Sequence, residues 1–153
     1  MVIFDSAVEG DAHVSFVATH NKRGGSLGAE HLIQLMGDEK GPVMLMRFVQ
    51  GTGSCEARAA GFIETVTAAG FEVVADPYPE DGTAAGCIKT ASNTMEGFVK
   101  DGKLAIGGIF ACNDRATLGV LAALEDLRKS GIEVDANFVG FDFNPKLVAS
   151  LQD

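Results

Sequence analysis

The sequence predicts an α/β fold, a Rossmann-like, doubly wound parallel sheet with helices on both faces. Apolar runs of strand length alternate with segments whose apolar residues recur every three or four positions. This alternation is typical of βαβ units, in which a helix connects two parallel strands. At 153 residues the chain is long enough for one domain with a sizeable core and short for two.

Six apolar runs are the predicted strands, and they are bounded by helical patterns or by loops such as "EKGP" and "DGTAAG". A parallel sheet covered on both faces accounts for their largely apolar character. The predicted strands are residues 1–4, 14–19, 42–49, 71–75, 105–111 and 137–141.

Helices are predicted between these strands. In residues 55–69 the apolar stripe comprises Ala59, Phe62, Ile63 and Val66, and in 114–129 it comprises Leu118, Leu121, Ala122 and Leu124. Gly70 and Gly131 follow these two helices where a C-cap glycine is expected. Further helices are predicted over about 23–36, ending at Gly37, over about 83–99, and from Pro145 onward; residues 97–104 are a predicted connection.

Composition excludes several classes of partner and site. The formal net charge is -9, and Lys and Arg are few and scattered, so no nucleic-acid partner is expected. No apolar stretch approaches the ~20 residues of a membrane span, and residues 1–10 do not have the pattern of a signal peptide. Cys55, Cys87 and Cys112 form no C-x-x-C pair and lack a nearby His, which predicts packed thiols rather than a metal site or a disulfide framework.

Enzyme motifs are also missing from the sequence. "GTGSCEARAAG" follows a strand and opens a helix, but Glu56 stands where a dinucleotide loop needs its third glycine, and no P-loop Lys-Ser/Thr follows. There is no G-x-S-x-G elbow, and His13, His20 and His31 have no recognisable nucleophile. We therefore expect a protein that is not an enzyme and that uses no cofactor or metal.

Polar residues after three predicted strands form the candidate binding site. Arg58 lies in the helix after strand 42–49, Asn113 follows strand 105–111, and Asp142 follows strand 137–141. Because ligands of open parallel sheets bind beyond the carboxyl ends of the strands, these side chains should converge. A guanidinium, an amide and a carboxylate together suit a neutral polyol, whereas Asp142 would repel a phosphate.

Each of these residues also has a plainer interpretation. Asn113 or Asp114 is suited to cap the following helix, and Asp114 is the better candidate for capping alone. Arg58 alone is typical of a solvated surface charge, and Asp142 of a turn. Ser54 is placed to cap the helix over 55–69, and Phe110 and Phe141 fit buried strands better than a stacking surface for a sugar. The convergence of three strand ends favours the binding site.

Four segments carry a resemblance to a known family, in its order and spacing. The chain resembles the periplasmic sugar-binding proteins of ribose and galactose type, which are components of ABC transporters and have the two-lobed type I solute-binding fold. The effector domains of lac-repressor-type regulators are close relatives. The four segments are "VATHNKRGGSLGAEHL", "EARAAGF", "FACNDRATLGVLAAL" and "VGFDFNP".

The resemblance implies specific roles for residues and segments. Arg58 matches the Arg of the family's R-x-x-G-F motif, Asn113 the Asn of its N-D motif, and Asp142 the Asp of G-F-D, all sugar contacts. Asp5 matches an Asp at the end of the first lobe's last strand that holds sugar hydroxyls. Residues 1–13 then correspond to the remnant of the first lobe and a crossing segment, and 14–153 to a second lobe, incomplete at its C-terminus.

The family also implies a monosaccharide such as ribose or galactose as ligand, the transporter permease as partner, and a periplasmic location. Without a signal peptide the chain as given would stay cytoplasmic. Most of the first lobe, with its aromatic stacking, and the C-terminal continuation have no counterpart here, and His20-Asn21 replaces the family's Asp-Asn. We therefore expect weak sugar binding, millimolar or worse. An effector domain of a regulator, or a fragment that forms a homodimer through its apolar strand 1–4, remains as an alternative.

Overall fold

The structure is a computed structural model, and it describes residues 2–5, 10 and 14–149. Its main sheet has four parallel strands in the order β4-β3-β7-β8. These strands are β3 (Pro42–Met46), β4 (Glu72–Ala75), β7 (Gly108–Ala111) and β8 (Asn137–Val139). The helices are α1 (Asn21–Met36), α2 (Gly53–Ala68), α3 (Ala84–Glu96), α4 (Asp114–Lys129) and α5 (Pro145–Ala149).

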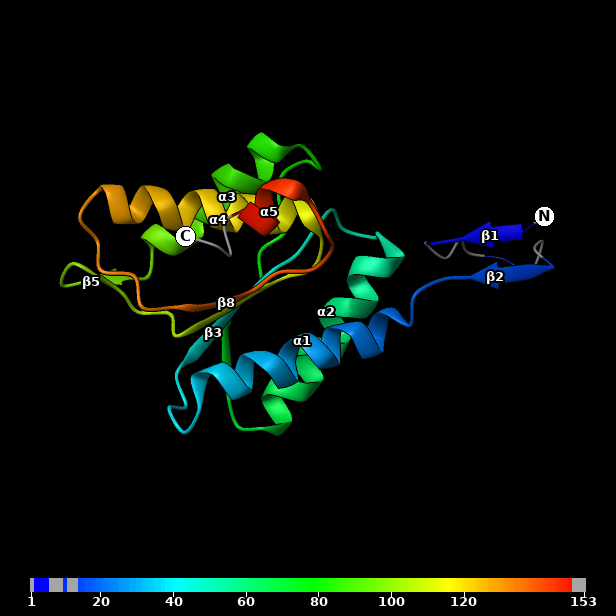
Figure 1. Ribbon diagram of the computed structural model, residues 1–153, viewed down its shortest axis with the longest axis horizontal. Coiled ribbons are helices and arrows are strands. Elements are labelled where there is room, and N and C mark those ends of the chain that lie inside the picture. Colours follow the sequence, from blue (N-terminus) through cyan, green and yellow to red (C-terminus); the bar gives the residue numbers. More distant parts are fainter. Residues whose placement is uncertain (1, 6–9, 11–13, 150–153) are drawn as a thin grey trace.

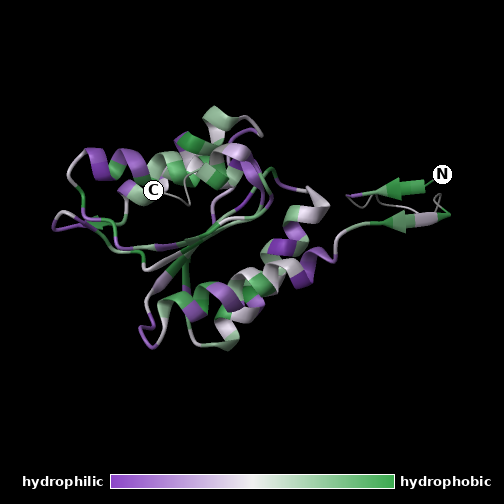
Figure 2. Ribbon diagram, in the orientation of Figure 1, coloured by the Kyte–Doolittle hydropathy of each residue, from purple (hydrophilic) through white to green (hydrophobic). Residues whose placement is uncertain are grey.

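Helices cover both faces of this sheet, which confirms the predicted fold class. Figure 1 shows α1 and α2 on one side of the strands and α3 and α4 on the other. β3 and β7 are the central strands, and β7 is buried at every position. Figure 2 shows hydrophobic residues concentrated along these strands, between the two helical layers.

Each face of the sheet has its own apolar core. On the α1/α2 side, Phe62 stacks on Phe110 with ring centroids 4.6 Å apart and nearly parallel planes. On the α3/α4 side, the core combines the methionines Met44, Met46 and Met95 with alanines and with branched aliphatic side chains such as Ile106 and Ile109. Burial of these apolar groups on both faces is the main stabilising contribution to the fold.

Most helix boundaries agree with the sequence, but one buried face does not. The glycines expected at helix ends, Gly37, Gly70 and Gly131, all have positive φ, at 61°, 85° and 80°. In α2 the predicted stripe faces the core, except that Ile63 is half-buried. In α4 the predicted stripe was misplaced, because Leu118, Leu121 and Ala122 are only half-buried and Leu124 alone of the four is buried. The buried residues of α4 are Ala116, Thr117, Gly119, Val120, Ala123, Leu124 and Leu127.

The two N-terminal strands differ most from the expected arrangement. β1 (Val2–Phe4) and β2 (Ser15–Val17) pair in parallel as a separate two-stranded sheet rather than joining the main one. They project beyond the ends of α1 and α2 (Figure 1). Both strands expose apolar side chains, including Phe4 at 79% and Val17 at 62%. Their apolar character therefore does not mark burial in this chain.

The segment 97–104, expected to be a plain connection, contains a small hairpin. β5 (Val99–Lys100) pairs antiparallel with β6 (Lys103–Leu104) around Asp101 and Gly102, both of which have positive φ. Two-residue strands carry too little alternation to be recognised in a sequence.

α1 and α2 cross at unusually short distance through two glycines. A Cβ atom at Gly25 would lie 1.8 Å from the backbone oxygen of Arg58, and one at Gly61 would lie 2.0 Å from that of Lys22. Only residues without a Cβ allow the two backbones to approach this closely. The crossing fixes the first turns of α1 against the middle of α2, where Arg58 lies.

Candidate functional site

The carboxyl ends of the parallel strands form one edge of the main sheet, called here the rim. Asn113 follows β7 and Asp142 follows β8, while Arg58 reaches the rim from α2. Arg58 and Asn113 are buried, with 6% and 9% of their surface exposed, whereas 39% of the Asp142 side chain is exposed. The structure thus brings these three predicted residues together at the rim, and the contacts below join them.

The guanidinium of Arg58 is held by four neighbours. Its Nε donates to Oδ1 of Asn21 at 2.9 Å, and its Nη1 donates to the backbone oxygen of Cys112 at 2.8 Å. Its Cζ lies 3.9 Å from the centroid of the Phe141 ring, a cation–π contact, and Nη1 lies 3.6 Å from Oδ2 of Asp142. These contacts fix the orientation of a charge that is largely removed from water.

Asp142 connects the ends of β8 and β7. Its Oδ2 accepts a hydrogen bond from the backbone N–H of Asp114 at 3.3 Å, besides facing Arg58. Its φ of 71° lies in the left-handed region, which costs free energy for a residue with a Cβ. Thr117 Oγ1 accepts from the Phe141 N–H at 3.2 Å and donates to the Asn113 oxygen at 2.7 Å, which ties this turn to α4.

Asn113 is the N-cap of α4, so the assignment of capping to Asp114 was wrong. The Asn113 Oδ1 accepts from the backbone N–H of Ala116 at 2.9 Å, and its backbone is extended, as an N-cap requires. Asp114 is instead the first helical residue, where its charge complements the helix dipole. Ser54 was also misassigned, because Thr52 is the N-cap of α2 and Ser54 lies inside the helix.

Two donors at the rim have no protein partner among the described residues. They are Nη2 of Arg58 and Nδ2 of Asn113, for which the structure shows no hydrogen bond. No side-chain nitrogen or oxygen in the described part of the chain is both buried and unpaired. Both donors are therefore open to solvent or to a ligand, beside the partly exposed carboxylate of Asp142.

Asp5 does not join this cluster. It lies directly after β1, is exposed, and has a φ of 71°; its backbone N–H donates to the Val17 oxygen at 2.9 Å. No hydrogen bond or ion pair links its carboxylate to Arg58, Asn113 or Asp142 in the described ranges.

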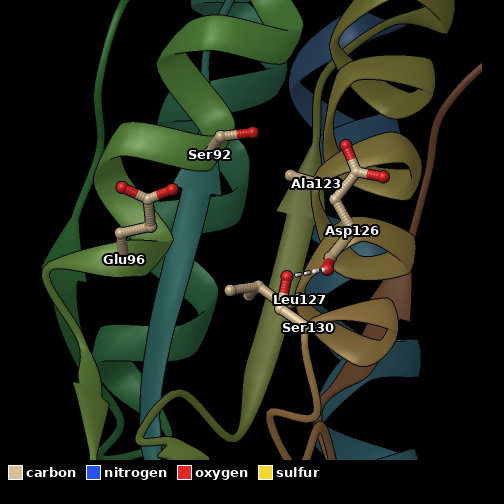
Figure 3. Close-up of a pocket in the computed structure, with 6 residues that line it drawn as sticks. All are labelled: Ser92, Glu96, Ala123, Asp126, Leu127 and Ser130. Atoms are coloured by element: carbon tan, nitrogen blue, oxygen red, sulfur yellow. Dashed lines mark hydrogen bonds between the residues drawn. The ribbon is translucent and has the colours of Figure 1, made fainter.

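One cavity lies beside the rim and another lies away from it, near the C-terminal ends of α3 and α4. One of about 310 Å³ extends along the outer edge of β8 from Asp142, between α1, α4 and α5, and its lining is largely apolar. The other, of about 60 Å³, lies between α3 and α4 (Figure 3). It is lined by Ser92, Glu96, Ala123, Asp126, Leu127 and Ser130. The smaller cavity has room for little more than water.

All three cysteines are free and buried, as predicted. The interaction between the Cys55 and Cys112 thiols, together with burial, raises the pKa of Cys112, and the same interaction lowers the pKa of Cys55, helped by Arg58. Burial, followed by the charge of Asp81, raises the pKa of Cys87.

The free energy of unfolding should therefore fall at alkaline pH. Above about pH 8.5 the unfolded chain loses thiol protons that folded Cys87 and Cys112 retain, at a cost of up to ~1.4 kcal/mol per pH unit for each thiol. The lowered pKa of Cys55 acts in the opposite direction. Urea titrations of the reduced protein between about pH 8 and pH 10 should show the fall, and Cys87→Ala should reduce its slope. An equal slope in Cys87→Ala and in the wild type would contradict the raised pKa of Cys87.

Sequence reasoning missed two neighbours of the site, Asn21 and the ring of Phe141. Phe141 was assigned to the core, and it does pack there, but it also supports the guanidinium of Arg58.

A second rim cluster was missed as well. Arg47 donates to Asp76, Glu56 and Tyr78, and its pKa is raised by these partners even though burial opposes the shift. Asp76 follows β4, so the strand-end rule that found Asn113 would have found it.

The described residues include no group of three or more His, Cys, Asp or Glu side chains placed to hold a metal ion. None of the helices in this part of the chain has both the length and the apolar character of a membrane span.

Comparisons with known proteins agree on one family. A family model described as "Periplasmic binding protein domain" matches residues 1–153. The ribose import binding protein of Salmonella typhimurium is 29% identical over 147 residues, which are 96% of this chain and 46% of that protein. The chain thus spans about half the length of the curated relatives it matches.

Solved structures give the same picture. The periplasmic component of an ABC-type sugar transport system from Hahella chejuensis superposes with a TM-score of 0.86 at 27% identity, over 99% of this chain and 52% of that one. A carbohydrate transporter solute-binding protein from Agrobacterium radiobacter, in complex with D-arabinose, gives 0.83 at 29% identity, over 99% and 50%. The match over the whole sequence shows that the chain belongs to the periplasmic binding protein domain family.

Proposed function

We propose that this chain binds the hydroxyl groups of a monosaccharide at the rim, as part of the solute-binding component of an ABC sugar transporter. The observation that carries the proposal is the joined cluster of Arg58, Asn113 and Asp142, with two unpaired donors beside a partly exposed carboxylate. The transporter permease is the protein partner that family membership supports.

The chemistry of the cluster suits a neutral polyol. Nη2 of Arg58 and Nδ2 of Asn113 can donate to hydroxyl oxygens, while Asp142 can accept from hydroxyl hydrogens. The charges of Arg58 and Asp142, which lie 3.6 Å apart, offset each other, so this pair offers no net charge for an ionic ligand to match. Relatives that are 29% identical to this chain have ribose or D-arabinose in their names, which supports an aldose as the ligand.

We infer further that residues 14–153 correspond to one lobe of the two-lobed family fold, and that residues 1–13, with Asp5, belong to the other lobe and a crossing segment. The chain's coverage of about half of each relative supports this division. A sugar held at one rim alone stays exposed to water, where each hydrogen bond contributes only about 0.5–1.5 kcal/mol. Binding by this chain should therefore be millimolar or weaker, since association itself is costly.

A fluorescent reporter next to Asp142 would test the proposal. The chain contains no Trp, and Phe143 is 79% exposed directly after Asp142. We expect the emission of Phe143→Trp to change saturably as ribose, arabinose or galactose is added to high millimolar concentration. The matched control is Leu35→Trp, at a 47% exposed position in the last turn of α1, away from the rim. No change in the first variant, or the same change in both, would overturn the proposal.

Self-association is a second candidate role, and the exposed apolar residues of β1 and β2 favour it. Pairing of these strands between two copies would form a homodimer. Light scattering should then give a dimer mass that falls on dilution, and that Phe4→Lys abolishes. A monomer at all concentrations would count against this role.

A further inference from the structure

Of the residues that contact the guanidinium of Arg58, Asn21 lies farthest in the sequence from the ends of β7 and β8. Its Oδ1 accepts from Nε at 2.9 Å, and only 9% of Asn21 is exposed. Among the described residues, Nε has no other hydrogen-bond acceptor. Asn21 itself touches neither Asn113 nor Asp142 by any hydrogen bond in the described ranges, so its contact with the cluster runs through Arg58 alone.

The glycine crossing of α1 and α2 places this contact. Gly25 lies one turn after Asn21 on α1 and faces the backbone of Arg58, while Gly61 lies one turn after Arg58 on α2 and faces the backbone of Lys22. Gly25 thus lies one turn from Asn21 and packs on α2, which carries Arg58. Gly61 lies one turn from Arg58 and packs on α1, which carries Asn21. The short separation of the backbones brings a short amide side chain within reach of Nε.

Asn21 is also the first residue of α1, at the point where the chain arrives from β2. Residues 18–20 form no helix or strand, and His20 caps α1 by accepting the Arg23 N–H on Nδ1 at 3.3 Å. The Asn21 N–H donates to the Thr19 oxygen at 2.7 Å. One residue therefore contacts both the segment from β2 and the arginine of the rim.

We propose that Asn21 is a positioning residue for Arg58, and that it links the β2–α1 segment to the sugar site. Asn21 occupies Nε, and the Cys112 oxygen and Asp142 occupy Nη1, so that Nη2 remains the free donor. Without Asn21 the guanidinium keeps its contacts on Nη1 and with the Phe141 ring but loses its hydrogen bond at Nε. A movement of the β2–α1 segment would shift Asn21 and with it the donor that Arg58 presents. This inference rests on the proposed function for its role in binding, although the positioning of Arg58 can be tested without any sugar.

The test compares the Nε–H resonance of Arg58 in the ligand-free chain and four variants by NMR. The resonance is assigned through its loss in Arg58→Lys. Asn21→Leu and Asn21→Ser remove the acceptor, and serine, which is too short to reach Nε, keeps a residue suited to the start of a helix. Asn21→Asp keeps an oxygen in place. Asn93→Leu, on the exposed face of α3, is the control for the substitution itself.

We expect the Nε–H of Arg58 to exchange with water roughly tenfold or more faster in Asn21→Leu and Asn21→Ser, which corresponds to the loss of one charged hydrogen bond. Asn21→Asp and Asn93→Leu should keep the original exchange rate, and backbone amides of α2 should keep theirs in every variant that folds. Ribose titration of the same set should show weaker binding only where Nε–H protection is lost. Unchanged Nε–H protection in Asn21→Ser would overturn the positioning role. A wild-type chain that shows no response to ribose, arabinose or galactose would overturn the proposed function alone, because the exchange comparison needs no ligand.

Discussion

Gly25→Ala is expected to destabilise the chain by about 3 kcal/mol or more, since overpacking against backbone cannot be relieved by a side-chain rotation. The new Cβ would lie 1.8 Å from the Arg58 oxygen, so α1 and α2 would have to separate where they cross. The expected shift is measurable as a lower midpoint of urea unfolding with an unchanged slope.

A matched substitution separates this effect from the general effect of replacing glycine. At Gly41 a Cβ would meet Met36 Cε at 3.5 Å and Gly107 Cα at 3.8 Å, both ordinary van der Waals distances. Gly41→Ala should therefore change the free energy of unfolding by less than about 1 kcal/mol. Equal stability of the two variants would show that the helices do not cross as closely as described.

Arg58→Met should lower the free energy of unfolding by about 2–4 kcal/mol, because two acceptors lose their donor in a buried place. These acceptors are the Asn21 Oδ1 and the Cys112 oxygen. Methionine retains an apolar contact with Phe141, so the loss reflects the hydrogen bonds, the charge and the cation–π contact of Arg58. Thermal or urea unfolding measures the loss.

Lys89→Met is the control for removing a positive charge from an ion pair. Lys89 and Glu80 lie 3.2 Å apart, and both side chains are exposed. Such a pair contributes about 0–1 kcal/mol, so this variant should unfold almost like the wild type. If Arg58→Met were as stable as Lys89→Met, the buried hydrogen bonds from Arg58 to Asn21 and Cys112 would not stabilise the fold as described.

The main sheet was predictable because its strands are buried between two helical layers. Runs such as 42–49 and 105–111 are apolar for that reason, and the residues after them fall at the rim by the geometry of parallel strands. For residues 1–4 and 14–19 the same pattern predicted strands correctly but gave a wrong expectation of their burial. These runs look like buried strands in the sequence, yet β1 and β2 form their own small sheet and expose several apolar side chains.

The candidate site was predictable in its residues and less so in its contacts. The strand-end rule pointed to Asn113 and Asp142, but it could not assign the cap, because Asn113 and Asp114 are both good capping residues. The contact of Asn21 could not be predicted from the sequence, for a different reason. Its contact with Arg58 depends on how closely two helices cross, and that distance is set by Gly25 and Gly61, which carry no pattern of their own.

Sugar binding by Arg58, Asn113 and Asp142 at the rim can be followed residue by residue in an amide NMR titration with ribose, arabinose and galactose. We expect saturable shifts at these three residues and in the first turn of α4. We expect none at Gly37 and Gly131, where α1 and α4 end, at the opposite edge of the sheet. No shift at the rim in high millimolar sugar, or shifts confined to other surfaces, would contradict sugar binding at the rim.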